Sequence, residues 1–115
     1  MSAESRNALA ERFLAEGLRT EHHPLIRFTE GASGRRQPML VGTRLYVHQI
    51  LSTLRSTEVS PGDVAVDFGI PERLVRAAIA YYGSFRDEVD ADAEHAERFA
   101  QEERKRWESE QSALA

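Results

Sequence analysis

The chain has 115 residues, no cysteine and a net charge of −4 at pH 7, which suits one small domain with extensions and excludes a disulfide framework or a thiolate zinc site. The N-terminal segment lacks the features of a signal peptide and no stretch resembles a membrane span, so we expect a cytoplasmic protein. Acidic residues crowd the chain after Phe85, whereas the segment from Pro24 to Phe85 has more arginines than carboxylates, which suggests that the two parts meet different partners.

The first predicted element is an amphipathic helix over residues 3–15. Its apolar side includes Leu9 and Phe13, and Gly17 is expected to end it. The face could contact a partner, but simple packing on the domain is the favoured interpretation. His22 and His23 follow in a predicted loop, and no third histidine completes a metal site there.

A small β-hairpin is predicted next. Residues 25–28 read as a short strand, the turn-rich segment EGASGRRQP at residues 30–38 as a loop, and residues 39–41 and 45–47 as further extended segments. Three arginines cluster around this hairpin, where they could hold phosphates or be ordinary exposed charges: Arg35, Arg36 and Arg44. From His48 to Arg55 the spacing of apolar residues changes to that of a helix.

The segment from Ser60 to Tyr82 predicts two helices joined by a tight turn. Ser60 is a good N-cap and Pro61 suits the first helical position. Gly69 stands where a left-handed residue would end the first helix, and Ala65 is small where the two helices should cross. With the preceding helix this arrangement predicts a trihelical, homeodomain-like helix-turn-helix core. We expect eight residues to be buried there: Ile50, Leu51, Leu54, Val64, Phe68, Ile70, Val75 and Ile79.

If this corner binds DNA, the start of its second helix enters the major groove. The outward positions of that helix include Glu72, Arg73, Arg76 and Ala77. Arginine can read guanine through two hydrogen bonds or pair with phosphate, so Arg73 and Arg76 are the predicted DNA contacts. The same two residues would be equally suitable as solvated surface charges.

After Gly83 and Ser84, which should loosen the chain, a second long helix is predicted from about Asp87 to Trp107. Small and aromatic residues follow one stripe of it and are the predicted partner-binding residues: Val89, Ala93, Ala96, Phe99, Ala100 and Trp107. Such a narrow stripe is weak as a core of its own, so we expect it to lie on another surface.

The runs VGTRLYVHQILSTLR and SPGDVAVDFGIPERLVRAAIAYY resemble the family called domain of unknown function 433. The most specific pieces are Gly42-Thr43-Arg44, Ser60-Pro61 and Val75-Arg76-Ala77-Ala78. Members often have a glycine-lysine-proline lead before the GTR turn, where this chain has Arg36 and Pro38. The resemblance covers residues 25–82 and implies a bacterial antitoxin of the VapB type, partnered with a toxin of the PIN ribonuclease class.

Together these features predict a mainly α protein in three parts: an N-terminal helix and linker (1–23), a hairpin plus helix-turn-helix core (24–85) and an acidic C-terminal helix (86–115). The predicted function is that of a homodimeric DNA-binding antitoxin and autoregulator, with operator DNA and a PIN-like toxin as partners. The alternative is a protein-interaction module of the same shape that does not bind DNA. No nucleophile motif or phosphate-binding glycine loop is readable, so we predict neither an enzyme nor a bound cofactor.

Overall fold

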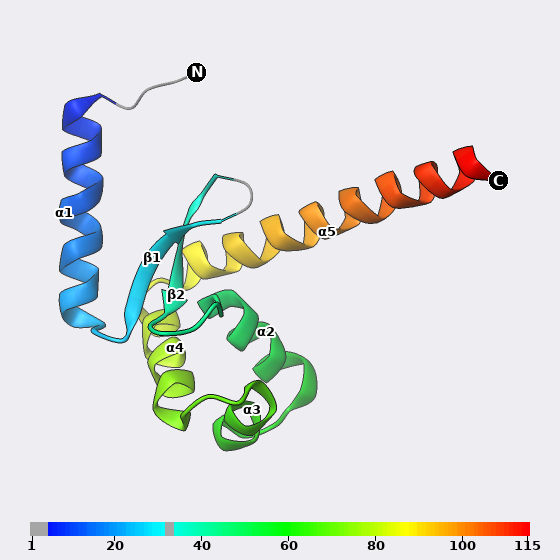
Figure 1. Ribbon diagram of the computed structural model, residues 1–115. Coiled ribbons are helices and arrows are strands. Elements are labelled where there is room, and N and C mark those ends of the chain that lie inside the picture. The colour runs from blue at the N-terminus through cyan, green and yellow to red at the C-terminus, as the bar shows by residue number, and fades with distance from the viewer. Residues whose placement is uncertain (1–4, 32–33) are drawn as a thin grey trace.

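The computed structural model describes residues 5–31 and 34–115, which form five helices and a two-stranded antiparallel sheet (Figure 1). In chain order the elements are α1 (Arg6–His22), β1 (Ile26–Glu30), β2 (Arg36–Leu40), α2 (Val47–Thr57), α3 (Pro61–Phe68), α4 (Glu72–Ser84) and α5 (Arg86–Leu114). The chain is therefore mainly helical, as predicted. No helix among the described residues is both long and apolar enough to cross a membrane.

The hairpin pairs β1 with β2 in a register that runs from Ile26 opposite Leu40 to Glu30 opposite Arg36. The prediction of a loop throughout residues 30–38 was therefore wrong at both ends, because Glu30 belongs to β1 and β2 already begins at Arg36. Pro38 cannot donate a ladder hydrogen bond, but both strands of a two-stranded sheet are edges, where proline is tolerated. Residues 32 and 33 of the predicted loop lie outside the described residues.

The helical corner has the caps that its sequence predicts. The Ser60 hydroxyl accepts a hydrogen bond from the Asp63 N–H at 3.2 Å and opens α3. Gly69 ends α3 in the left-handed conformation with φ of 68°, and the next N–H, that of Ile70, donates to the Ala65 carbonyl at 3.0 Å. α4 then begins after Pro71 and packs across α2 and α3.

The hydrophobic core lies between the hairpin, the three helices α2–α4 and the first turns of α5. Four of the eight residues predicted to be buried are buried (Ile50, Leu51, Val64, Val75) and three are half-buried (Leu54, Phe68, Ile70). The prediction for Ile79 was wrong, since this side chain is 37% exposed at the edge of the buried face of α4. The largest fully buried side chain is instead that of Tyr81.

α1 is longer than predicted. It begins after the N-cap Ser5, passes through Gly17 without a break and ends at His22. The predictions that Gly17 ends the helix and that His22 lies in a loop were therefore wrong, and residues 3 and 4 of the predicted helix lie outside the described residues. None of the described residues of α1 is buried, although the helix packs along β1.

α5 follows α4 after a single non-helical residue, Phe85. Gly83 and Ser84 do not loosen the chain, because both lie within α4. The first turns of α5 pack on α2 and α4, and the rest of the helix projects away from the domain (Figure 1). The radius of gyration is consequently 16.7 Å, against about 13 Å for a compact domain of this length.

Candidate nucleic-acid interface

α4 has one face in the core and the opposite face in solvent. Leu74, Val75 and Ala78 are buried, whereas the side chains of Arg73 and Arg76 are exposed one turn apart near the start of the helix. Ala80 follows on the same exposed side. The structure thus presents two long cationic side chains next to a small one, a surface that allows close approach of a polyanion.

The two arginines differ in their surroundings. Arg76 Nη2 lies 3.5 Å from Glu72 Oε1 in an exposed pair within the helix. The same carboxylate is close to Gly62 in the first turn of α3. Arg73 forms no ion pair with any residue that the structure describes and is the more available cation. Ala77 is half-buried, so it contributes less exposed surface than its neighbours.

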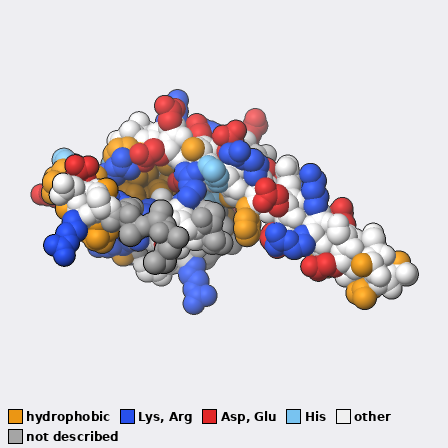
Figure 2. All heavy atoms as spheres, turned by 90° about the horizontal axis from the view of Figure 1, so that it is seen from above, with side chains coloured by type: hydrophobic (Ala, Val, Ile, Leu, Met, Phe, Trp, Pro, Cys, Tyr) orange, Lys and Arg blue, Asp and Glu red, His pale blue; other side chains and the backbone are white. Residues whose placement is uncertain are grey.

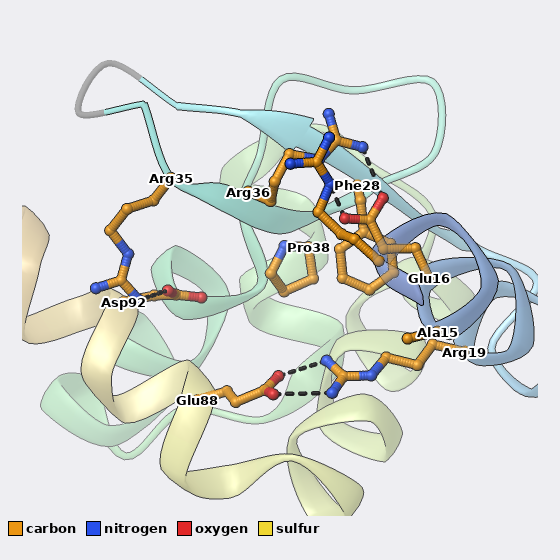
Figure 3. Close-up of a pocket in the computed structure, with 10 residues that line it drawn as sticks. Ala15, Glu16, Arg19, Phe28, Arg35, Arg36, Pro38, Glu88 and Asp92 are labelled. Carbon is orange, nitrogen blue, oxygen red and sulfur yellow. Dashed lines mark hydrogen bonds and ion pairs between the residues drawn. The ribbon is translucent and has the colours of Figure 1, made fainter. Parts of the chain in front are cut away.

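The arginines of the hairpin are engaged within the protein. Arg36 donates to both carboxylate oxygens of Glu16 in α1, at 2.6 and 3.1 Å, and Arg35 donates to Asp92 in α5 at 2.9 Å (Figure 3). Figure 1 places the start of β2 at the opposite end of the domain from α3 and the start of α4. Arg35 and Arg36 therefore join elements of the fold together. Arg44 is exposed and, among the described residues, has no ion-pair partner.

These ion pairs surround a cavity of about 300 Å³ between α1, the hairpin and α5 (Figure 3). On its far side Arg19 donates to both oxygens of Glu88, at 2.5 and 2.8 Å, and to the Tyr81 hydroxyl at 3.2 Å. The Arg19 guanidinium also lies 4.0 Å from the centre of the Phe85 ring. Its hydrogen bond to Glu88 raises the pKa of Arg19, which stays cationic.

Three polar side chains are buried among the described residues: Gln37, His48 and Asp92. Burial raises the pKa of Asp92, and the nearby Arg35 opposes that rise. His48, at the start of α2, stacks on Tyr46 with ring centres 5.5 Å apart, and burial lowers its pKa. Sequence patterns did not identify Asp92, Glu16, Arg19 or Glu88 as interacting residues, because their partners are distant in the chain and no local spacing connects them.

The predicted partner-binding residues of α5 are partly buried in the domain and partly exposed. Val89 is 1% exposed and belongs to the core, so its prediction as a partner-binding residue was wrong. Ala93 is half-buried, and the other four predicted residues are exposed (Ala96, Phe99, Ala100, Trp107). Ala96 and Phe99 line a cavity of about 190 Å³ with residues of the hairpin and α2, whereas Ala100 and Trp107 lie farther out on the helix. Figure 2 shows acidic and basic side chains intermixed along this projection. The buried face of the first turns thus continues outward as a narrow exposed stripe.

In comparisons with protein-family models, curated proteins and solved structures, nothing matches this chain.

Proposed function

We propose that this protein is a DNA-binding antitoxin and autoregulator of a toxin–antitoxin pair. In this proposal α3 and α4 act as a homeodomain-like helix-turn-helix, with the start of α4 in the major groove of operator DNA. The projecting part of α5 lies on a PIN-like ribonuclease toxin. The protein works in the cytoplasm as a homodimer, which suits an operator with two half-sites.

The observation that carries the DNA-binding proposal is the outward face of α4. Arg73 and Arg76 are exposed one turn apart at the start of the helix, which follows a capped turn at Gly69. The Glu72–Arg76 pair does not prevent DNA binding, since an exposed pair within a helix is worth only ~0.3–0.5 kcal/mol. A base contact through arginine contributes ~1–3 kcal/mol, so the exchange is favourable.

The test is a fluorescence anisotropy titration against the promoter of the protein's own gene, at two salt concentrations. Arg73→Ala and Arg76→Ala should each weaken binding by ~1–3 kcal/mol if they read bases, and should reduce the salt dependence if they contact phosphate. Arg98→Ala is the matched control, because Arg98 is an exposed cation on the projecting helix. If wild type shows no salt-sensitive binding even with its toxin present, the DNA-binding proposal fails.

The proposed toxin contact rests on the exposed stripe of α5. Trp107 is the single tryptophan of the chain and is 60% exposed, so it reports directly on contacts made by this helix. The toxin is identified by co-purification as the product of the neighbouring gene. Its binding should shift the fluorescence emission of Trp107 to shorter wavelength. Phe99→Glu should weaken that complex, whereas Val66→Glu, an equally drastic change of an exposed residue on α3, should not.

A second candidate is a protein-interaction module that does not bind DNA. Two observations favour it: the net charge of −4, and the ion pairs that occupy Arg35 and Arg36. Of the three arginines predicted around the hairpin, these pairs leave Arg44 available to a polyanion. Retained toxin binding by a protein without DNA affinity would support this second function over the first.

A further inference from the structure

α1 presents an apolar face to solvent. Its inner side carries Glu16 and Arg19, which are held by Arg36 and Glu88. Its outer side carries large apolar residues: Phe13 is 55% exposed and Leu14 is 67% exposed. Leu18 is 51% exposed at the margin of this face, where it lines a cavity with Ser84 and Phe85. Leu9 lies at the edge of this face, and the small residues Ala10 and Gly17 are also exposed. A helix that had only to pack on its own domain would not need this second apolar face.

We propose that α1 pairs in antiparallel fashion with α1 of a second copy of this chain, with the two-fold axis between Phe13 and Leu14. In this register Phe13 and Leu14 of the two copies meet around the axis, whereas Leu9 and Leu18 lie on opposite sides of the helix, at the two margins of the contact. Ala10 meets Gly17, and two small residues opposite each other let the helix axes approach closely. A two-fold axis requires a surface that is complementary to itself, and the spacing of these residues provides it.

The charges at the two ends of α1 select the same arrangement. Arg6 and Glu21 are exposed and flank the apolar face. In the antiparallel register each Arg6 faces Glu21 of the second copy, so the pairing has an ion pair at both ends. A parallel pairing would instead place Arg6 opposite Arg6 and Glu21 opposite Glu21, which is repulsive. The charges therefore favour a second copy in one orientation.

The face is also held rigidly before pairing. Arg36 donates hydrogen bonds to Glu16, and Arg19 donates hydrogen bonds to Glu88. These bonds lie on both sides of Gly17 and fix the helix on the hairpin and α5. Rigid surfaces lose less entropy on association. One helix of 17 residues per subunit forms a small interface, so we expect a monomer–dimer equilibrium on the order of micromolar.

The homodimer is the one part of the proposed function on which this inference rests. Its test needs neither DNA nor toxin. Sedimentation equilibrium of the full chain over a range of concentrations gives the dissociation constant of the dimer. Leu14→Glu should raise that constant at least about tenfold. Leu114→Glu, the same change at an exposed position of α5, should leave it unchanged. Circular dichroism checks that both variants keep their helices.

A charge exchange tests the orientation. Arg6→Glu and Glu21→Arg should each weaken the dimer, and the double variant should restore it. A chain that stays monomeric at all concentrations, or a dimer that is insensitive to Leu14→Glu, would overturn the proposal. A double variant that dimerises more weakly than both single variants would also overturn it. DNA binding is measured separately, so either proposal can fail while the other stands.

Discussion

Arg19 offers the sharpest test of how α1 is attached to the domain. Its side chain makes three kinds of contact at once: two hydrogen bonds to Glu88, one to the Tyr81 hydroxyl and a stacked position over Phe85. Glu88 is half exposed, so the ion pair is worth only ~0.2–1 kcal/mol. The contact with the ring adds ~0.5–1 kcal/mol.

The larger effect comes from Tyr81. Its ring is fully buried, so removal of the Arg19 donor leaves a buried hydroxyl without that partner, at a cost of ~1–3 kcal/mol. Arg19→Ala should therefore lower the free energy of unfolding by about 2–5 kcal/mol. Glu88→Gln removes only the ion pair and should lower it by ~0.2–1 kcal/mol.

Urea unfolding followed by circular dichroism measures both values, and hydrogen exchange at the α1 amides shows whether this helix detaches before the rest of the domain. Arg19→Lys keeps the charge but loses the planar two-pronged contact, so it should resemble Arg19→Ala more than wild type. Equal losses in Arg19→Ala and Glu88→Gln would refute the reasoning, because the Tyr81 and Phe85 contacts would then contribute nothing.

Other positions give simpler expectations. Gly69→Ala should destabilise by ~1–2 kcal/mol because φ there is 68°. Gly83→Ala, in the last turn of α4 where an added Cβ would meet no other atom, should stabilise by up to ~1 kcal/mol in the same denaturation assay. Ile50→Ala should cost ~2–5 kcal/mol by leaving a cavity in the core, and a loss below 1 kcal/mol would contradict the burial of this side chain. Burial lowers the pKa of His48, so the unfolded chain binds its proton more readily. The contribution of neutral, buried His48 to the free energy of unfolding is therefore complete above about pH 6.5 and declines as the pH falls below that value. His48→Gln should flatten this decline in the free energy of unfolding.

The parts of the fold that the sequence predicted are those set by local chemistry. Ser60 and Gly69 cap α3 through contacts within a few residues, and the apolar spacing of α4 places Leu74 and Val75 in the core. Such signals are visible in a short window of sequence. The homeodomain-like arrangement of the corner and its use on DNA remain predictions.

The errors arise where distant residues decide the outcome. Glycine at position 17 disfavours a helix by about 1 kcal/mol, yet α1 continues, because ion pairs from Glu16 and Arg19 hold both sides of that position. Arg36 joins β2 since Glu30 lies opposite it in the hairpin. Val89 is buried because the start of α5 packs on α2. None of these partners is recognisable from the neighbouring sequence.

The junction at Phe85 makes α5 a lever. α5 has 29 residues, so its far end lies about 40 Å from the junction. A change of only about 10° in the direction of α5 would displace Leu114 by about 7 Å. At the junction the rings of Phe85 and Tyr81 are in contact, with their centres 4.7 Å apart. Since Tyr81 belongs to α4, this contact joins the base of the projecting helix to the element that carries Arg73 and Arg76.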